Sequence, residues 1–214
     1  MIFLKTKFWL HREEKQVKQF FYWHDRFKEI DKQLSLAYAY RNPYQISRKY
    51  LQKQGAEDIH LYGETPLTTM RRIVEECAIG PQDVVIEMGA GRGRTSFFLS
   101  EYIGCHVYAM EQIPEFVESA ENIAKKFDCK KVHFSCRDMM EADFQKATVI
   151  YLYGTCLSDS TIEMLTDLLP SQIKIITVSY PLCDYSKNFV TLKQFSAPFP
   201  WGSATIYLNQ KIEQ

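Results

Sequence analysis

The 214-residue sequence lacks several features that mark whole classes of protein. It has no run of 18 apolar residues, so we expect no transmembrane helix. Lys5 and Lys7 interrupt the opening MIFLKTKFWL, so we expect no signal peptide. The 26 basic and 26 acidic residues cancel, so no overall charge favours nucleic acid or a membrane surface. We therefore expect a cytoplasmic protein that forms no stable nucleic-acid complex.

Metal-binding patterns are also missing. The six cysteines form no CxxC pair, and no histidine stands at metal-ligand spacing from a cysteine pair. We find no DxxD arrangement of acids either, and we expect no metal. Cys105 and Cys136 fall in apolar, strand-like runs. The cysteines are interpreted as buried, reduced thiols of a cytosolic protein.

From residue 61 onward the sequence alternates between two kinds of segment. Helical patterns at 94–103, 114–127 and 159–169 separate apolar runs, which lie at 83–88, 106–110, 131–136, 147–153 and 173–180. Apolar strands separated by helices predict an α/β fold with a parallel sheet. Two further strand-like runs, 189–199 and 203–211, are separated only by PWG, which predicts a C-terminal antiparallel hairpin. Together, the five parallel strands and the two hairpin strands predict a seven-stranded sheet.

Residues 1–60 have a different character. They hold 12 basic and 7 acidic residues and 12 of the 30 aromatic residues. Apolar residues recur at helical spacing over 13–40, and a second short helix is expected to end at Gly55. We therefore divide the chain into a helical N-terminal extension, 1–60, and a cofactor-binding domain, 61–214. The extension is interpreted as a cap or homodimer contact, with substrate recognition as the alternative.

The stretch IEMGAGRGRT, residues 86–95, connects the first strand of the sheet to a helix. Its expected cofactor-binding residues are Glu87, Gly89, Ala90, Gly91 and Gly93. Glycines allow a sharp turn and close approach of a ligand, and the helix start offers N–H groups to an anion. The spacing differs from the dinucleotide pattern GxGxxG, because Arg94 stands where the third glycine belongs. Glu87 would repel a pyrophosphate but suits a ligand that carries an ammonium and a sulfonium, which favours S-adenosylmethionine over a nicotinamide dinucleotide.

The sequence VVIEMGAGRGRT resembles the first motif of class I S-adenosylmethionine-dependent methyltransferases. The element order over 62–210 is similar to their Rossmann-like seven-stranded fold. Glu111, followed by Gln112, ends the second strand, where an acid can accept hydrogen bonds from both ribose hydroxyls. The resemblance implies that Asp138 contacts the adenine amino group and that Met139 packs on the ring. Alternatives are a solvated acid at a helix start for Glu111 and a helix N-cap for Asp138.

The stretch YGET, residues 62–65, resembles a motif of Dot1-type lysine methyltransferases. This resemblance implies that Glu64 and Thr65 approach the methionine end of the cofactor. The alternative is an ordinary helix start, which Thr65 and Pro66 would serve equally well. The stretches VIYLYGTCLSDS, TVSYPL and APFPWGSATIYLNQ have a more diffuse resemblance to the lysine methyltransferases of the ATP synthase c-subunit.

The end of the fourth strand, YLYGTC at 151–156, lacks the [DNS]PP[YFW] pattern of enzymes that methylate nucleic-acid amino groups. Tyr151 and Tyr153 share one face of the strand and are our candidate catalytic residues, as walls of a lysine pocket. The alternative is that both are core aromatics. We expect methyl transfer from S-adenosylmethionine, with a protein or small molecule as acceptor and a protein lysine preferred. The alternatives are a non-catalytic binding module, or methylation of a small molecule or RNA.

Overall fold

The computed structural model describes residues 2–56 and 58–212, and the side chains from residue 6 onward. One sheet contains seven strands in the order β3-β2-β1-β4-β5-β7-β6. Strands β1 to β5 pair in parallel, and β7 is antiparallel to both β5 and β6. The strands are β1 Val84–Met88, β2 His106–Glu111, β3 Val132–Cys136, β4 Val149–Leu152, β5 Lys174–Val178, β6 Phe189–Phe199 and β7 Gly202–Lys211. The predicted α/β sheet with a C-terminal hairpin is confirmed.

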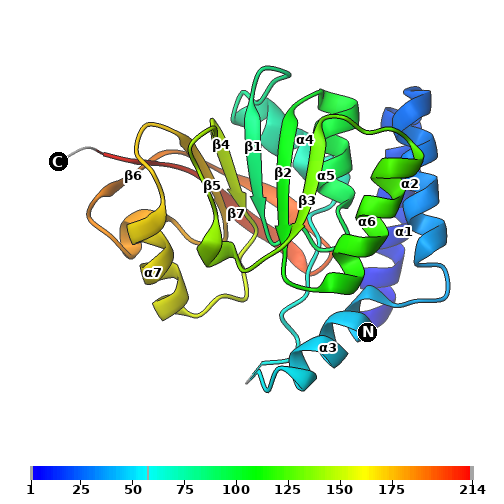
Figure 1. Cartoon of the computed structure of the whole chain (residues 1–214), viewed down its shortest axis with the longest axis horizontal. Helices are drawn as coiled ribbons and strands as arrows, with labels where there is room; N and C mark the ends of the chain where they lie inside the picture. Colours follow the sequence, from blue (N-terminus) through cyan, green and yellow to red (C-terminus); the bar gives the residue numbers. More distant parts are fainter. Residues whose placement is uncertain (1, 57, 213–214) are drawn as a thin grey trace.

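Helices cover the two faces of this sheet unequally (Figure 1). The α-helices are α1 Ile2–Phe21, α2 Asp25–Ala37, α3 Pro43–Lys53, α4 Leu67–Glu76, α5 Arg94–Phe97, α6 Pro114–Lys126 and α7 Asp159–Leu168. A π-helical turn, η1 Phe98–Ile103, continues α5, and 3-10 turns η2 Met139–Glu141 and η3 Leu182–Asp184 follow β3 and β5. Helices α1, α2, α4, α5 and α6 lie on one face and α7 on the other. Each face has its own hydrophobic cluster.

The N-terminal segment is helical as predicted, but the prediction of one continuous helix over 13–40 is wrong. Helix α1 ends at Phe21 and α2 begins at Asp25, where the side chain of His24 accepts a hydrogen bond from the backbone N–H of Phe27. Neither glycine nor proline marks this turn, and apolar residues continue at helical spacing across it. The pattern alone therefore could not reveal the break.

Helices α1 and α2 pack into the same core as the sheet. Phe21, Phe27 and Leu34 are buried in the cluster that contains the strand residues Val85 and Val107. Burial on this scale makes the two helices part of the packed core. The division of the chain at residue 60 and a homodimer through these helices both stay predictions.

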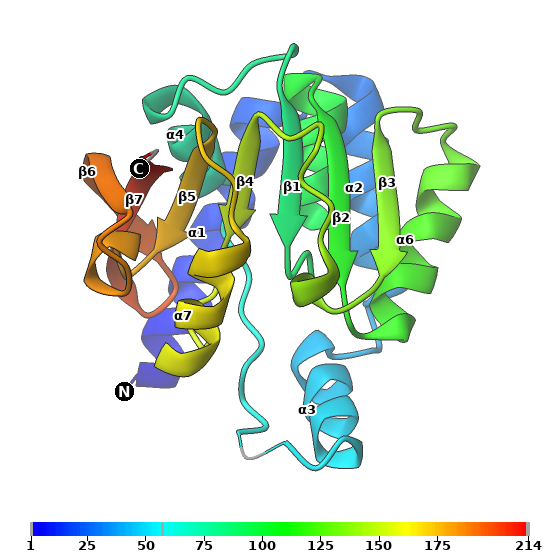
Figure 2. The ribbon, with the colours of Figure 1, turned by 60° about the vertical axis from the view of Figure 1, so that its left-hand side comes forward.

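Helix α3 lies beyond the carboxyl ends of β1 and β2 (Figure 2). The chain then returns as an extended segment to α4, and this segment contains Tyr62 to Thr65. Ligands of open α/β sheets bind at the carboxyl ends of the strands. The fold thus brings α3 and the YGET segment to the edge where the glycine-rich loop lies.

The prediction of a buried set of cysteines is wrong in part. Cys77 and Cys105 are buried, whereas Cys136, Cys156 and Cys183 are exposed. Cys136 is the last residue of β3, an edge strand whose later residues are only partly covered. Over the described ranges, no three His, Cys, Asp or Glu residues are grouped to hold a metal ion. No helix in the described part of the chain has the length and apolarity to cross a membrane.

Candidate active site

The glycine-rich loop leaves β1 and enters α5. Gly89 and Gly93 adopt φ angles of 81° and 82°, in the left-handed region that favours glycine. A Cβ atom at Gly93 would lie 2.6 Å from a ring carbon of Phe134, so a side chain has no room there. A Cβ at Gly89 would meet no atom within 4 Å, which leaves open space beside the loop. The glycines thus serve close packing at one end of the loop and access at the other.

Glu87 is a buried carboxylate at the centre of this region, with 3% of its surface exposed. It pairs in register with Tyr151 of β4, and it accepts hydrogen bonds from the hydroxyls of Thr95 and Ser96. Burial raises the pKa of Glu87 to about 7, and the two hydroxyls oppose that shift. Within residues 2–56 and 58–212 Glu87 forms no ion pair with a basic side chain. A buried acid with only hydroxyl partners suits a cationic ligand.

The YGET segment lies against the glycine-rich loop. Arg92 donates two hydrogen bonds to Glu64, from Nε to Oε1 at 2.7 Å and from Nη2 to Oε2 at 2.8 Å. The hydroxyl of Tyr62 donates to the same carboxylate. Burial alone would raise the pKa of Glu64, but Arg92 and Tyr62 outweigh it and hold the pKa below its ordinary value. The hydroxyl of Thr65 hydrogen-bonds to that of Tyr151, so the segment also contacts β4.

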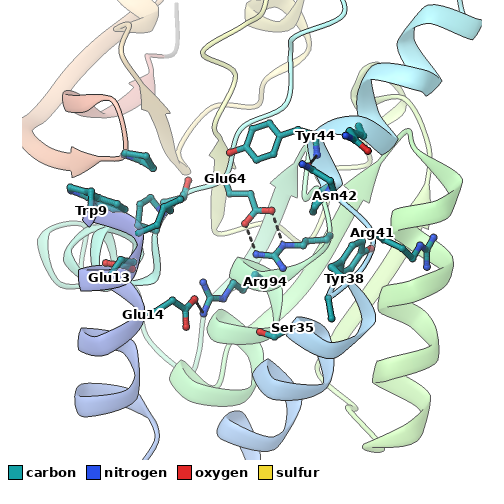
Figure 3. Close-up of a pocket in the computed structure, with 18 of the residues that line it drawn as sticks. Trp9, Glu13, Glu14, Ser35, Tyr38, Arg41, Asn42, Tyr44, Glu64 and Arg94 are labelled. Atoms are coloured by element: carbon teal, nitrogen blue, oxygen red, sulfur yellow. Dashed lines mark hydrogen bonds and ion pairs between the residues drawn. The ribbon is translucent and has the colours of Figure 1, made fainter. Parts of the chain in front are cut away.

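Two adjoining cavities meet at this segment. The narrow one, about 20 Å³, is lined by Gly63, Glu64, Thr65, Glu87, Gly89, Ala90, Arg92, Arg94, Thr95, Tyr151 and Tyr153. The wide one, about 720 Å³, opens between α1, α2 and α3. Figure 3 shows Trp9, Glu13 and Glu14 along α1, Tyr38 directly after the end of α2 and Tyr44 on α3, with Glu64 between them. Glu64, Thr65, Arg92 and Arg94 line both cavities, so they form the wall between them.

Seven of the predicted site residues line the narrow cavity: Glu64, Thr65, Glu87, Gly89, Ala90, Tyr151 and Tyr153. The other six do not: Gly91, Gly93, Glu111, Gln112, Asp138 and Met139. The carboxylate of Glu111 accepts hydrogen bonds from the backbone N–H groups of Gly91, at 2.8 Å, and Ile113, at 2.9 Å. It therefore supports the loop and keeps two oxygens that could each accept a further bond.

The residues expected around adenine lie farther along the edge. Asp138 is exposed and caps η2, where it accepts a hydrogen bond from the backbone N–H of Met140. Gln112 is exposed, and Met139 packs against the cluster on the α7 side of the sheet. Asp138 thus has the cap geometry that was the alternative to a ligand contact. The cofactor roles of all these residues stay predictions.

The residues present fit S-adenosylmethionine. Glu87 would present a buried carboxylate to its cationic end, and Glu111 would offer acceptors at the end of β2, where a ribose binds in open sheets of this kind. Gly89 leaves open space beside the loop. The narrow cavity, at about 20 Å³, is far smaller than the cofactor, so it could enclose only part of it.

Several residues of the site were not predicted from the sequence. Thr95 and Ser96 directly follow the loop. Their hydroxyls, in the first turn of the predicted helix, could have indicated hydrogen-bond partners for Glu87. Asp31, Trp9 and Tyr44 come from the N-terminal helices, and nothing local to them indicated the site. Their positions depend on contacts between segments that are distant in the sequence.

The sequence matches one family model and two curated relatives. The family model described as histone methylation protein DOT1 matches residues 43–177. A histone-lysine N-methyltransferase, H3 lysine-79 specific, from Dictyostelium discoideum is 22% identical over 171 residues, 72% of this chain and 9% of that protein. A protein-L-isoaspartate O-methyltransferase from Protochlamydia amoebophila (strain UWE25) is 35% identical over 66 residues, 31% of each protein. The chain thus spans less than a third of the length of either curated relative.

Solved structures share the fold. An MtNAS mutant in complex with S-adenosylmethionine matches with a TM-score of 0.58 and 14% identity, over 69% of this chain and 62% of the other. An RNA methyltransferase from Salinibacter ruber in complex with S-adenosyl-L-homocysteine matches with a TM-score of 0.56 and 22% identity, over 71% and 95%. At these identities the likeness concerns the fold alone. Because the DOT1 model covers more than half of the sequence, the chain belongs to the Dot1 family of histone methylation proteins, within the class I S-adenosylmethionine-dependent methyltransferases.

Proposed function

We propose that the protein transfers a methyl group from S-adenosylmethionine to the side-chain amine of a lysine in a partner protein. The observation that carries the proposal is the narrow cavity at the carboxyl ends of β1 and β4. There the YGET segment, Glu87 of the cofactor loop, and Tyr151 with Tyr153 line one space. Membership of the Dot1 family supports a lysine acceptor.

The bound cofactor supplies an electrophilic methyl group, and the chain must present a neutral amine in line with it. Tyr153 is suited to this task. It lines the narrow cavity, and its ring lies 6.2 Å from Phe199 and 6.3 Å from Trp201, measured between ring centroids. Aromatic walls remove water from the lysine, which lowers the pKa of the amine and favours the neutral form. They also attract the methylated ammonium through cation–π contact.

The wide cavity supplies a route for the acceptor. Its lining includes Trp9, Tyr44 and Pro200, and it reaches the narrow cavity at Glu64 and Thr65. A long, unbranched side chain entering from solvent could pass between these aromatic residues to the cofactor. This assigns part of the acceptor site to the N-terminal helices, in keeping with the substrate-recognition alternative for residues 1–60.

Two measurements test the proposed function. Calorimetry with S-adenosylhomocysteine and with NAD should show binding of the first ligand only. Incubation of the protein with methyl-labelled S-adenosylmethionine and lysate should then label protein, and hydrolysis should release methyl-lysine. Binding of NAD alone would refute the cofactor assignment. Binding without any labelled product would favour a non-catalytic module, and label in RNA or small molecules would favour those acceptors.

Replacement of Tyr153 tests the acceptor wall. We expect Tyr153→Ala to slow methyl transfer about tenfold, because an aromatic wall contributes roughly 1–2 kcal/mol to a desolvated cation. Affinity for S-adenosylhomocysteine should stay within about threefold. Tyr153→Phe keeps the ring and should retain most of the rate. Tyr185→Ala is the matched control, because Tyr185 packs against the α7-side cluster on the opposite face of the sheet. Equal losses of rate in Tyr153→Ala and Tyr153→Phe would contradict a role for the ring.

A further inference from the structure

A second large cavity, of about 540 Å³, continues the wide cavity around the start of α3. Four residues line both cavities: Tyr40, Arg41, Asn42 and Gln45. The opposite wall of the second cavity is formed where α6 begins, by Ile113 and Pro114. Glu87, Glu111 and Asp138 do not line it, so it is separate from the expected cofactor site. We call the wide and the second cavity together the α3 groove.

The two parts of the α3 groove differ in charge. In the wide cavity the charges cancel, because three carboxylates and three guanidinium groups line it: Glu13, Glu14, Glu64, Arg41, Arg92 and Arg94. The second cavity has a single acid, Glu115, which pairs with Arg41. Lys49 and Lys53 also line it, are exposed, and form no ion pair within residues 2–56 and 58–212. The second cavity therefore carries a surplus of two positive charges.

The sequence of α3 accounts for this surplus. The helix, PYQISRKYLQK, contains basic residues and no acidic residue. Ser47 and Leu51 are buried on its inner face. Gln45, Lys49 and Lys53 follow one another at intervals of four residues on another face, and all three line the second cavity. This face of α3 thus presents a row of hydrogen-bond donors to the groove, and no acid of the same helix neutralises the two ammonium groups.

The α3 groove has room for more than one side chain of an acceptor, because its wide part alone encloses about 720 Å³. Lys49 and Lys53 follow Tyr44, which lines the wide cavity, by about 8 and 14 Å along the helix. An extended chain covers these distances with about two to four residues. With one or two further residues between the acceptor lysine and Tyr44, acidic residues roughly three to six positions from that lysine would reach the two ammonium groups.

We propose that the α3 groove binds an extended, acidic segment of the acceptor protein, with the acceptor lysine at the wide cavity and aspartates or glutamates beside Lys49 and Lys53. The proposal rests on the proposed function, because it specifies the kind of acceptor. Carboxylates complement the two ammonium groups, while Ile46 and Tyr50 offer apolar contacts to the bound chain. Complementary charge of this kind selects among acceptors and speeds their association.

Two synthetic peptides test the proposal by binding alone. Each has a central lysine, three glycines on either side of it and three residues at each end, which are glutamates in one peptide and glutamines in the other. Fluorescence anisotropy at low salt should show that the unaltered protein binds the glutamate peptide about fivefold more tightly. Lys49→Gln/Lys53→Gln should bind the two peptides equally, and Lys49→Glu/Lys53→Glu should prefer the glutamine peptide.

Lys28→Gln/Lys32→Gln is the matched control. These lysines are also four residues apart on one helix, and their replacement changes the net charge equally, but they pair with Asp25 and Glu29. The control should keep the preference for the glutamate peptide. An equal loss of preference in both double variants would reflect overall charge and overturn the proposal. Equal binding of the two peptides by the unaltered protein, or binding of neither, would also overturn it.

Two further measurements separate this proposal from the alternatives. If single-stranded DNA of similar length bound more tightly than the glutamate peptide and required the same two lysines, the groove would serve phosphates, and the proposal would be wrong. With methyl-labelled S-adenosylmethionine, equal kcat/KM for the two peptides would overturn the proposal and support the proposed function. Preferential binding without methyl-lysine in the peptides or in lysate protein would instead refute the proposed function, while the charge preference of the groove would stand.

Discussion

Asp31→Asn is expected to lower the free energy of unfolding by about 3 kcal/mol or more, because removing one member of a buried ion pair leaves the other uncompensated. Asp31 is 1% exposed and accepts hydrogen bonds from both Arg94 and Tyr22. Burial opposes its ionisation, but Arg94 and Tyr22 outweigh that and hold its pKa below the ordinary 3.8. The stabilisation is therefore present above pH 3.8 and is lost as the pH falls through the lowered pKa.

Thermal and urea unfolding measure this effect. For a chain of this size, 3 kcal/mol corresponds to a fall in Tm of about 6–12 °C. Glu29→Gln is the matched control, because Glu29 lies on the same helix and pairs with Lys32, yet its side chain is 53% exposed. Such a surface pair contributes less than about 1 kcal/mol. If the two variants were equally stable, the pair between Asp31 and Arg94 would not be what holds α2 to the loop.

The contact between Asp31 and Arg94 also joins α2 to the end of the glycine-rich loop. Arg94 follows Gly93 and begins α5, so releasing it from Asp31 frees the end of the glycine-rich loop. We expect the double variant Asp31→Asn/Arg94→Gln to lose less stability than the sum of the single variants, because both single changes break the same contact. Such a result would show that Asp31 of α2 and Arg94 at the start of α5 are energetically coupled.

Local patterns predicted the sheet well. Apolar runs and the short PWG connection indicated seven strands and the terminal hairpin, and each strand begins and ends within two residues of the expected position. The break between α1 and α2 was missed because His24 caps α2 without a glycine or proline beside it. Exposure of Cys156 and Cys183 was also missed, because it depends on where the loops after β4 and β5 lie.

The residues of the candidate site also fall into those that the local sequence predicted and those that it did not. Residues within the loop and at strand ends, such as Glu87 and Tyr151, were accessible from the sequence because parallel strands end at one edge. The partners of Arg92 and Arg94 were not, since Glu64 and Asp31 precede them by 28 and 63 residues. Only the packing of α2 and of the extended segment before α4 brings these charges together.

Cofactor binding is expected to depend on pH through Glu87. Its pKa is raised to about 7, so in the free protein it is largely protonated below that pH. An ammonium ligand requires the ionised form and lowers the pKa on binding. Affinity for S-adenosylhomocysteine should therefore fall as the pH decreases through about 7, by up to about tenfold per pH unit, and one proton should be released per ligand bound near pH 6.

5′-Methylthioadenosine, which keeps the adenosine and the thioether but lacks the amino-acid end, is the control for this profile. The pKa of Glu111 is also raised by burial, and Glu111 is our candidate ribose ligand. Both ligands contain the ribose, so any contribution from Glu111 appears with both of them. The ratio of the two affinities then reports Glu87, with Arg92 and Glu64 charged throughout because the pKa of Arg92 is raised and that of Glu64 is lowered. A ratio that did not change between about pH 5.5 and 8 would contradict the assignment of Glu87 to the ammonium.

Glu87→Gln separates binding from stability, because its two effects have opposite signs. Unfolding returns Glu87 to its ordinary pKa of 4.5. Between pH 4.5 and about 7 the folded protein therefore holds a proton that the unfolded protein has lost, so the free energy of unfolding decreases as the pH rises through that window. At pH 8 the uncompensated carboxylate costs on the order of 3 kcal/mol, which glutamine should remove. The same change should weaken S-adenosylhomocysteine about 30-fold or more, because the ammonium loses its charged partner. A variant that melts higher yet binds more weakly would identify Glu87 as a charge retained for the ligand, whereas a loss of both properties would identify it as a structural residue.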